Sequence, residues 1–255
     1  MPRHLFSFTL AAVLLASGTG AYAASTIPAG VSAAVSDAGR PDADKQKDSG
    51  RKPAESVAFA GIKKGDKVAD LMPGGGYFTR IFSKVVGDTG VVYAVQPPPR
   101  PNPEGATPAP SAVAKIAEDA AYKNVKVVVA RPSEYTLPEP VDVVWTSLNY
   151  HDIHNAPDNA YVAFNKAAFN ALKPGGTYIV IDHAAAPGSG SRDSSTLHRI
   201  DPEVVKKEVL EAGFKLEASG DVLKNKDDPH TVNVHDDKIR WQTDQFILKF
   251  SKPKK

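Results

Sequence analysis

The stretch "DLMPGGGYFTR", residues 70–80, joins an apolar run to a helical pattern through three consecutive glycines, Gly74, Gly75 and Gly76. Glycine lets the backbone adopt conformations that other residues avoid, and it lets the chain approach a ligand closely. When such a loop links a strand to a helix in an α/β protein, it lies at the carboxyl edge of the sheet, where ligands bind. The stretch therefore predicts both an α/β fold and the place of its site.

Apolar runs and helical patterns alternate on both sides of this loop. The runs typical of strands are residues 68–71, 90–96, 124–130, 141–148, 176–183 and 241–252. The helical patterns are residues 55–62, 77–87, 111–122, 159–172 and 201–214. Because helices bury continuous apolar strands on both faces, this order predicts a doubly wound, mostly parallel sheet. The final strand is reached without a helical crossover, so we expect it to be antiparallel.

Composition limits the possible partners and chemistry. The chain has 255 residues, of which 42% are hydrophobic and 24% charged, and this is enough for one domain with a proper core. A formal net charge of +2 gives no electrostatic footprint for nucleic acid, so we expect no nucleic-acid partner. The absence of cysteine excludes thiol chemistry and cysteine-ligated metal sites.

The N-terminal region predicts export. Residues 1–23 combine a short basic start, an apolar core and a small-residue cleavage site, which is the pattern of a signal peptide. Residues 24–53 are small, polar and charged without apolar periodicity, so we expect a disordered linker there. The folded domain is expected over residues 54–255. We therefore predict a periplasmic or secreted protein with no stable membrane insertion once the signal is cleaved.

The residues of the glycine loop narrow the choice of ligand. A nucleoside-triphosphate loop needs a Gly-Lys-Ser/Thr sequence, which is absent. The dinucleotide fingerprint fits less well, because Thr79 occupies the position of its third glycine. A ligand with a small anionic group near the helix start and a cationic group near Asp70 fits better. S-adenosylmethionine has both groups, a carboxylate and an amine.

Several motifs resemble the class I S-adenosylmethionine-dependent methyltransferases. "VADLMPGGGYFTRIF" resembles their motif I, and "ALKPGGTYIVIDH" resembles the turn into their fifth strand. More narrowly, "NYHDIHN", "DHAAAPGSG", "LHRID" and "TDQFILKF" resemble an uncharacterised branch of predicted exported bacterial methyltransferases. The resemblance covers residues 54–252. It implies a seven-stranded Rossmann-like methyltransferase fold, S-adenosylmethionine as cofactor and a small-molecule acceptor.

The same resemblance implies a set of cofactor-binding residues. Asp70, Gly74 and Gly76 match the acid and two glycines of motif I, whereas Met72 stands where the usual pattern has its first glycine. Gln96 stands where an acid usually binds the ribose hydroxyls, and Ser133 where an acid usually lies near the adenine. The residues that we expect at the cofactor are therefore Asp70, Met72, Gly74, Gly75, Gly76, Gln96 and Ser133.

Candidate catalytic residues follow the fourth and fifth predicted strands. Methyl transfer from a sulfonium is an in-line displacement, so the protein aligns the acceptor and removes its proton. We expect His151 or His183 to be the general base, with Asp182 orienting it and Tyr150 shaping the pocket beside Asn149.

The same cluster leaves a second hypothesis open. Imidazole and carboxylate groups at His151, His154, Asp182 and His183 suit zinc, copper or iron. The alternative to a methyltransferase is therefore a non-catalytic or metal-binding periplasmic protein on a methyltransferase fold. We assign no residue to a metal from the sequence.

Overall fold

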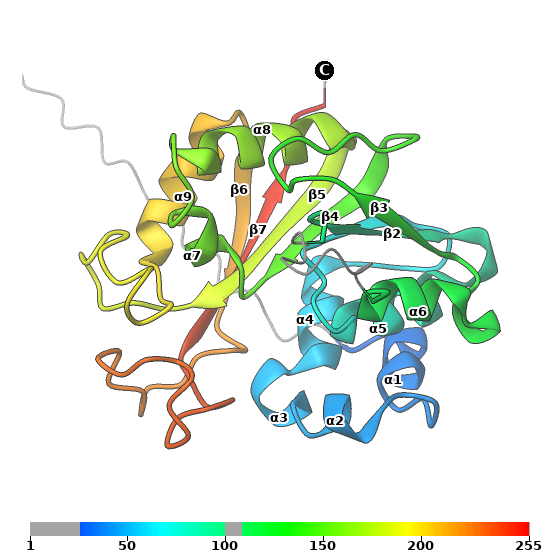
Figure 1. Ribbon diagram of the computed structural model, residues 1–255, viewed down its shortest axis with the longest axis horizontal. Coiled ribbons are helices and arrows are strands. Elements are labelled where there is room, and N and C mark those ends of the chain that lie inside the picture. The colour runs from blue at the N-terminus through cyan, green and yellow to red at the C-terminus, as the bar shows by residue number, and fades with distance from the viewer. Residues whose placement is uncertain (1–25, 100–108, 255) are drawn as a thin grey trace, which may run out of the picture.

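A seven-stranded sheet forms the centre of the computed structural model, which describes residues 26–99 and 109–254 (Figure 1). The strands are β1 Lys67–Leu71, β2 Val91–Gln96, β3 Val125–Val129, β4 Val141–Ser147, β5 Leu172–His183, β6 Lys215–Gly220 and β7 Gln245–Ser251. Their order is β3-β2-β1-β4-β5-β7-β6. Strand β7 runs antiparallel to its neighbours β5 and β6, and the other pairs of neighbouring described strands are parallel. The predicted doubly wound, mostly parallel seven-stranded sheet with an antiparallel last strand is confirmed.

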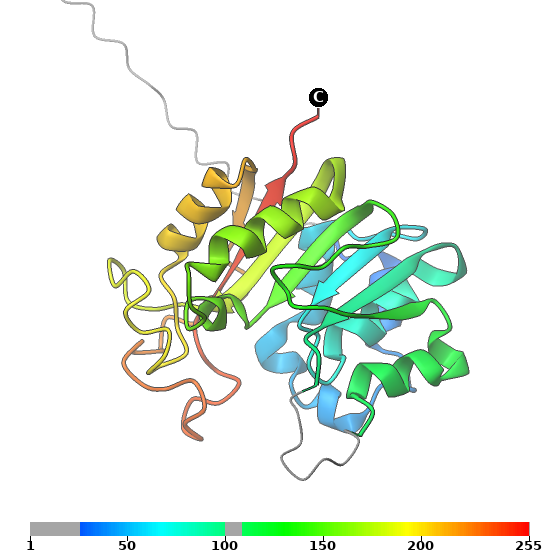
Figure 2. The ribbon, with the colours of Figure 1, turned by 45° about the horizontal axis from the view of Figure 1, so that its top comes forward.

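Helices cover both faces of the sheet (Figures 1 and 2). They are α1 Ala29–Val35, α2 Asp42–Lys45, α3 Asp48–Arg51, α4 Pro53–Ala60, α5 Tyr77–Val86, α6 Ala112–Glu118, α7 Tyr150–Ile153, α8 Ala160–Ala171 and α9 Pro202–Glu211. Alternate strand residues feed two apolar clusters, one with α1, α4, α5 and α6 and the other with α8 and α9. Trp145 of β4 packs against Phe78 and Phe82 of α5 in the first cluster. This double burial explains the continuous apolar runs of the strands.

Two long connections meet beside the carboxyl end of β5. Residues 184–201 follow β5, residues 221–244 join β6 to β7, and the two segments lie side by side in Figures 1 and 2. The Arg199 guanidinium makes two hydrogen bonds to the Asp228 carboxylate, of 2.8 and 3.0 Å, and both side chains are fully buried. The backbone N–H of Val234 donates to the carbonyl of Leu197 at 3.2 Å. These contacts hold the second connection against the first.

Residues 26–53 are ordered and form α1, α2 and α3, so the predicted disordered linker over residues 24–53 is wrong for its described part. Val31 and Ala34 of α1 enter the core. The Arg40 guanidinium makes two hydrogen bonds to the Asp48 carboxylate, of 2.9 and 2.7 Å. A polar segment can be ordered in this way because its charged groups pair with one another, which offsets the free-energy cost of burying them. The predicted signal peptide, residues 1–23, lies outside the described residues.

The described helices are short. None of those in residues 26–99 and 109–254 combines the length and the apolar character that a membrane crossing requires. The predicted helices at residues 77–87, 111–122, 159–172 and 201–214 all form near their expected bounds.

Candidate cofactor and acceptor site

The glycine loop turns sharply between β1 and α5. Met72, Gly74 and Gly76 have φ angles of 51°, 55° and 78°, in the left-handed region that favours glycine. A Cβ atom on Gly76 would lie 2.2 Å from Cδ1 of Ile116, so α6 packs directly on this residue. A Cβ atom on Gly74 or Gly75 would meet no heavy atom of residues 26–99 or 109–254 within 4 Å. Within this described part of the chain, the backbone at Gly74 and Gly75 therefore leaves space that a ligand could fill.

Asp70 lies at the carboxyl edge of β1, directly before this loop. Its side chain is only 3% exposed, and Oδ2 accepts a hydrogen bond of 2.6 Å from the Thr79 hydroxyl. Burial raises the pKa of Asp70 to about 7, although the Thr79 hydrogen bond and the Arg51 charge oppose the rise. A cationic group placed beside this carboxyl would favour its ionised form.

Arg51 of α3 brings a positive charge to the same place. Its guanidinium carbon lies 4.6 Å from the centre of the Tyr77 ring and 5.7 Å from that of Phe78. Burial lowers its pKa, with the charges of Tyr77, Asp44 and Asp70 opposing the shift. Its Nε atom has no hydrogen-bond partner among the described residues. A buried cation with an unused donor is suited to an anionic ligand group.

Helix α3, which carries Arg51, and the preceding helix α2 are hydrogen-bonded to the start of α5, directly after the glycine loop. The Tyr77 hydroxyl donates to Oδ1 of Asp48 at 2.6 Å. Nη1 of Arg80 donates to Oδ2 of Asp44 at 2.8 Å and to the carbonyl of Gly75 at 2.9 Å. Sequence reasoning missed Arg51, because the only signal around it was a charged stretch that is also typical of a linker.

The acceptor side of the site contains a histidine–carboxylate pair. Nδ1 of His151 lies 2.8 Å from Oδ1 of Asp182, and the backbone N–H of His151 donates to Oδ2 of Asp182 at 2.7 Å. Burial disfavours the charged imidazole, but the Asp182 carboxylate outweighs it and raises the pKa of His151. Burial likewise works against the charge of Asp182, but His151 and His183 overcome it and lower the pKa of Asp182. The pair fixes Nδ1 as a protonated nitrogen, and Nε2 lies on the other side of the ring, 3.4 Å from Oδ1 of Asp152.

His183, the other predicted base, has a different environment. Its Nδ1 lies 2.7 Å from the Thr243 hydroxyl. Burial lowers its pKa to about 3, although the Asp182 charge opposes the shift. His183 is therefore neutral and weakly basic at pH 7, and His151 is the better proton acceptor of the two.

Tyr150, predicted to shape the pocket, belongs to the core. Its side chain is fully buried, and its hydroxyl contacts Glu208 of α9 at 3.0 Å and Asn165 of α8 at 2.6 Å. Nε2 of His154 lies 3.1 Å from the same Glu208 carboxylate, and its ring stacks on Tyr161. The structure thus separates His154 from His151 and Asp182, with which the metal hypothesis grouped it.

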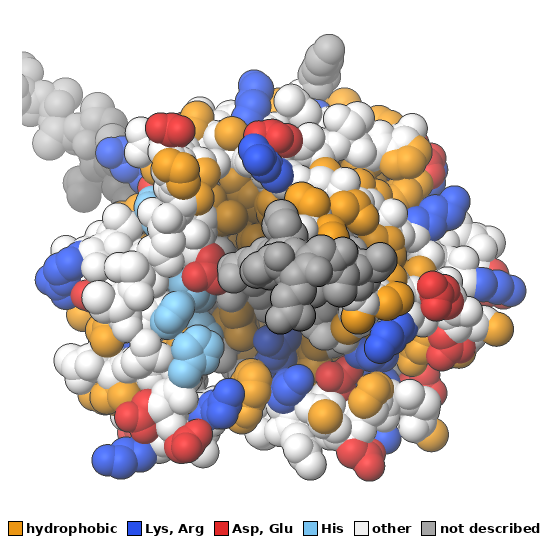
Figure 3. All heavy atoms as spheres, in the orientation of Figure 1, with side chains coloured by type: hydrophobic (Ala, Val, Ile, Leu, Met, Phe, Trp, Pro, Cys, Tyr) orange, Lys and Arg blue, Asp and Glu red, His pale blue; other side chains and the backbone are white. Residues whose placement is uncertain are grey.

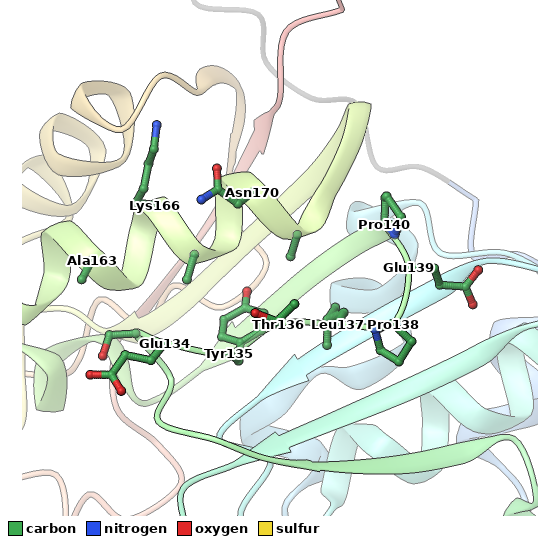
Figure 4. Close-up of a pocket in the computed structure, with 13 residues that line it drawn as sticks. Glu134, Tyr135, Thr136, Leu137, Pro138, Glu139, Pro140, Ala163, Lys166 and Asn170 are labelled. Atoms are coloured by element: carbon green, nitrogen blue, oxygen red, sulfur yellow. The ribbon is translucent and has the colours of Figure 1, made fainter.

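The remaining predicted residues lie on other parts of the same edge. Gln96 ends β2, and Asn149 follows β4, where its Nδ2 donates to the carbonyl of Met72 at 3.2 Å. Ser133 lines a cavity of about 450 Å³ between residues 133–140 and α8 (Figure 4). No residue of the glycine loop lines that cavity. The structure therefore groups Ser133 with α8 rather than with Asp70.

Comparison with solved structures identifies the fold. A SAM-dependent methyltransferase from Aquifex aeolicus aligns with 84% of this chain and 98% of its own, at 18% identity and a TM-score of 0.54. An arsenic(III) S-adenosylmethionine methyltransferase from Chlamydomonas reinhardtii aligns with 89% of this chain and 74% of its own, at 18% identity and a TM-score of 0.54. A glycopeptide N-methyltransferase, solved with S-adenosylmethionine, aligns with 78% of this chain and 86% of its own, at 14% identity and a TM-score of 0.52.

No protein-family model and no curated protein matches the sequence. The strand order and these similarities show that the chain has the Rossmann-like methyltransferase fold. At these identities the similarity carries the fold and no more, so the reaction must be argued from the site.

Proposed function

We propose that this protein is an S-adenosylmethionine-dependent methyltransferase that acts on a small-molecule acceptor. The observation that carries the proposal is the Gly74–Gly75 backbone, which no other described residue crowds, in the loop that follows the buried Asp70 carboxyl, whose pKa the Arg51 charge influences. These groups complement a ligand that carries both an amine and a carboxylate.

The residues present fit the cofactor chemically. Asp70 would hold the amino group, because a buried carboxylate favours a cation. Arg51 and the backbone N–H groups of the glycine loop would hold the carboxylate. Gln96, at the edge of the neighbouring strand, would donate to a ribose hydroxyl. When bound, S-adenosylmethionine supplies an activated methyl group on a sulfonium centre.

The acceptor would lie beside His151. In the neutral ring its Nε2 would accept the proton, and Asp182 both orients the ring and stabilises the charged form. The hydrogen bonds from the backbone N–H groups of His151 and His183 to Asp182 hold this carboxylate in place. A hydroxyl or amine acceptor that loses its proton as it is methylated matches this arrangement.

The proposed location is the periplasm or the cell exterior, on the strength of the signal-peptide pattern in residues 1–23. The nearly neutral charge supports a small molecule rather than a nucleic acid as acceptor.

The test is binding of S-adenosylmethionine and S-adenosylhomocysteine to the purified protein by calorimetry, together with thermal unfolding. A ligand that binds only the folded state raises the melting temperature at saturating concentration. We expect saturable binding of both ligands, and a loss of affinity in Asp70→Ala. An unchanged melting temperature with both ligands would overturn the proposal.

The second candidate function is metal binding on the same fold without methyl transfer. It is favoured by one observation, the cluster of metal-ligating atoms around His151. Calorimetry with the nucleoside ligands separates the two candidates, because a metal-binding protein without methyltransferase activity has no need of them.

A further inference from the structure

Three side chains at the carboxyl edge of β4 and β5 point ligand atoms at one another. His151, Asp152 and His198 each offer one ligand atom, and these three atoms all lie within 4.8 Å of one another. Nε2 of His151 lies 3.4 Å from Oδ1 of Asp152, and Nδ1 of His198 lies 3.7 Å from the same oxygen. The first two residues belong to α7 and the third to the connection after β5, so the fold alone brings them together.

These distances suit a metal ion. Nitrogen and oxygen ligands lie about 2.0–2.2 Å from zinc, and tetrahedral ligands at that radius are about 3.4 Å apart. Two of the pairs already lie near this separation. Contraction of the third pair needs only a small movement of His198, whose side chain is 30% exposed.

The residues behind the cluster have the arrangement of an outer ligand shell. Asp182 accepts from Nδ1 of His151, which directs the lone pair of Nε2 toward Asp152 and His198. Metal-bound histidines almost always donate their other ring N–H to such a carboxylate. Asp182 is fully buried and also accepts from the backbone N–H of His183, so this support is fixed before any ion binds.

The position of His198 is also held firmly. Its φ angle of 56° lies in the left-handed region, which is uncommon for a residue other than glycine. Strained backbone of this kind persists only where the surroundings enforce it. Here the next residue, Arg199, is fixed by its buried ion pair with Asp228. His235, from the connection between β6 and β7, places its ring 4.8 Å from that of His198.

The cluster is open on its outer side. The side chain of Asp152 is 53% exposed, and histidine side chains form a pale blue group on this face of the molecule (Figure 3). Three protein ligands with an open side leave coordination positions for water or for an oxygen of a bound molecule.

We propose that His151, Asp152 and His198 bind a divalent transition-metal ion of the zinc or iron(II) class, with His235 at its border. Two imidazoles and one carboxylate are the donors that such ions prefer. The site gives the second candidate function its ligands, and it does not depend on the methyltransferase proposal, because metal affinity can be measured without cofactor. With a metal ion bound, Nε2 of His151 would be a ligand and no longer a base, and the ion would instead lower the pKa of a coordinated hydroxyl.

The experiment uses the full protein freed of metal by a chelator. We expect calorimetry with zinc chloride and with cobalt chloride to show one equivalent bound, and cobalt to develop the visible absorption of a site with nitrogen ligands. Asp152→Asn and His198→Ala should each weaken zinc binding at least tenfold. The matched control is His154→Gln, since His154 lies three residues from His151 but faces Glu208, and its zinc affinity should be unchanged.

Two results would overturn the proposal: no binding of either ion to the wild-type protein, or affinity equal to wild type in both Asp152→Asn and His198→Ala. Asp152 and His198 are partly exposed, so their variants should fold, and circular dichroism checks this. Should one fail to fold, ¹⁵N chemical shifts of the wild-type histidines decide instead. Zinc must then shift Nε2 of His151 and Nδ1 of His198, and shifts of other nitrogens alone refute the site. Binding of S-adenosylmethionine is scored separately, so either proposal can fail without the other.

Discussion

The hydroxyl of Thr79 donates a hydrogen bond of 2.6 Å to Oδ2 of Asp70, and this bond joins the first turns of α5 to the end of β1. Thr79 stands where a dinucleotide-binding loop would have its third glycine. A side chain therefore occupies the space that such a loop leaves for close approach of helix and ligand. The same side chain gives one oxygen of the buried Asp70 carboxyl a hydrogen-bond partner. The ionisation of that carboxyl is the basis of the first two predictions.

Cofactor affinity should depend on the ionisation of Asp70. Its pKa of about 7 in the free protein means that the carboxyl is protonated in mildly acidic solution. Because a cationic amino group binds the carboxylate form, affinity for S-adenosylmethionine should rise with pH and level off above about 7. We expect the dissociation constant, measured by calorimetry, to be at least tenfold larger at pH 5.5 than at pH 7.5.

Two variants of this experiment isolate Asp70. Asp70→Asn should bind weakly at both pH values, with most of the pH dependence lost. Glu134→Gln removes an exposed carboxylate near the same edge and should behave like wild type. A steep pH dependence that persists in Asp70→Asn would assign the effect to another group.

Asp70 should also make the free protein less stable as the pH rises. The pKa of this group is raised from an ordinary 3.8 to about 7 by folding, so the folded state holds the proton more tightly. The resulting stabilisation is complete below the unfolded pKa and is lost as pH rises through about 7. Asp70→Asn should therefore gain stability relative to wild type between pH 5 and pH 8, by on the order of 2 kcal/mol. Urea denaturation at the two pH values measures this, and a gain that shrinks with rising pH would contradict it.

Arg51 should distinguish ligands by their carboxylate. Replacing Arg51 with Gln removes the cation that we place at the carboxylate of S-adenosylmethionine, and a charge-assisted hydrogen bond contributes about 1.5–3 kcal/mol. We expect about a tenfold to hundredfold loss of affinity for S-adenosylmethionine. Methylthioadenosine has the same nucleoside without that carboxylate, so its affinity should change little. Equal losses for both ligands would mean that Arg51 acts only through the packing of α3.

At position 72, a glycine variant should be more stable than an alanine variant, which is the reverse of the usual order. Its φ of 51° is costly for any residue with a Cβ, by about 1–2 kcal/mol. Met72→Ala and Met72→Gly lose the same packing, but only glycine relieves the strain. We expect the glycine variant to be more stable than the alanine variant by about 1 kcal/mol in denaturant unfolding, whereas in a helix or strand alanine is the more stable of the two. A more stable alanine variant would show that the loop relaxes.

The buried pair of Arg199 and Asp228 should be the most sensitive ion pair tested. Asp228→Ala leaves the Arg199 charge buried without its carboxylate, which destabilises proteins by about 3–5 kcal/mol. Glu211→Gln breaks a surface contact with Lys207 and should change stability by less than about 1 kcal/mol. Both are measured by urea denaturation, and a similar small effect of both variants would contradict the buried role.

The order of apolar runs and the glycine loop was enough to predict the sheet and the edge at which the candidate site lies. Apolar runs such as residues 141–148 must be buried on both faces, and a glycine loop directly after β1 can lie only at the carboxyl edge. His151 and Asp182 could be placed at that edge for the same reason, because each directly follows or ends a parallel strand.

Which of these side chains can take part in the candidate site depends on tertiary contacts. Tyr150 and His151 are adjacent in the sequence, but one is buried against Glu208 and the other faces Asp182. Arg51 and His198 come from segments without periodicity. Ion pairs between distant residues, which no local pattern encodes, hold these two segments in place. Local periodicity reports which residues must leave water, whereas the partners of a charged or hydrogen-bonding group are set by distant parts of the chain.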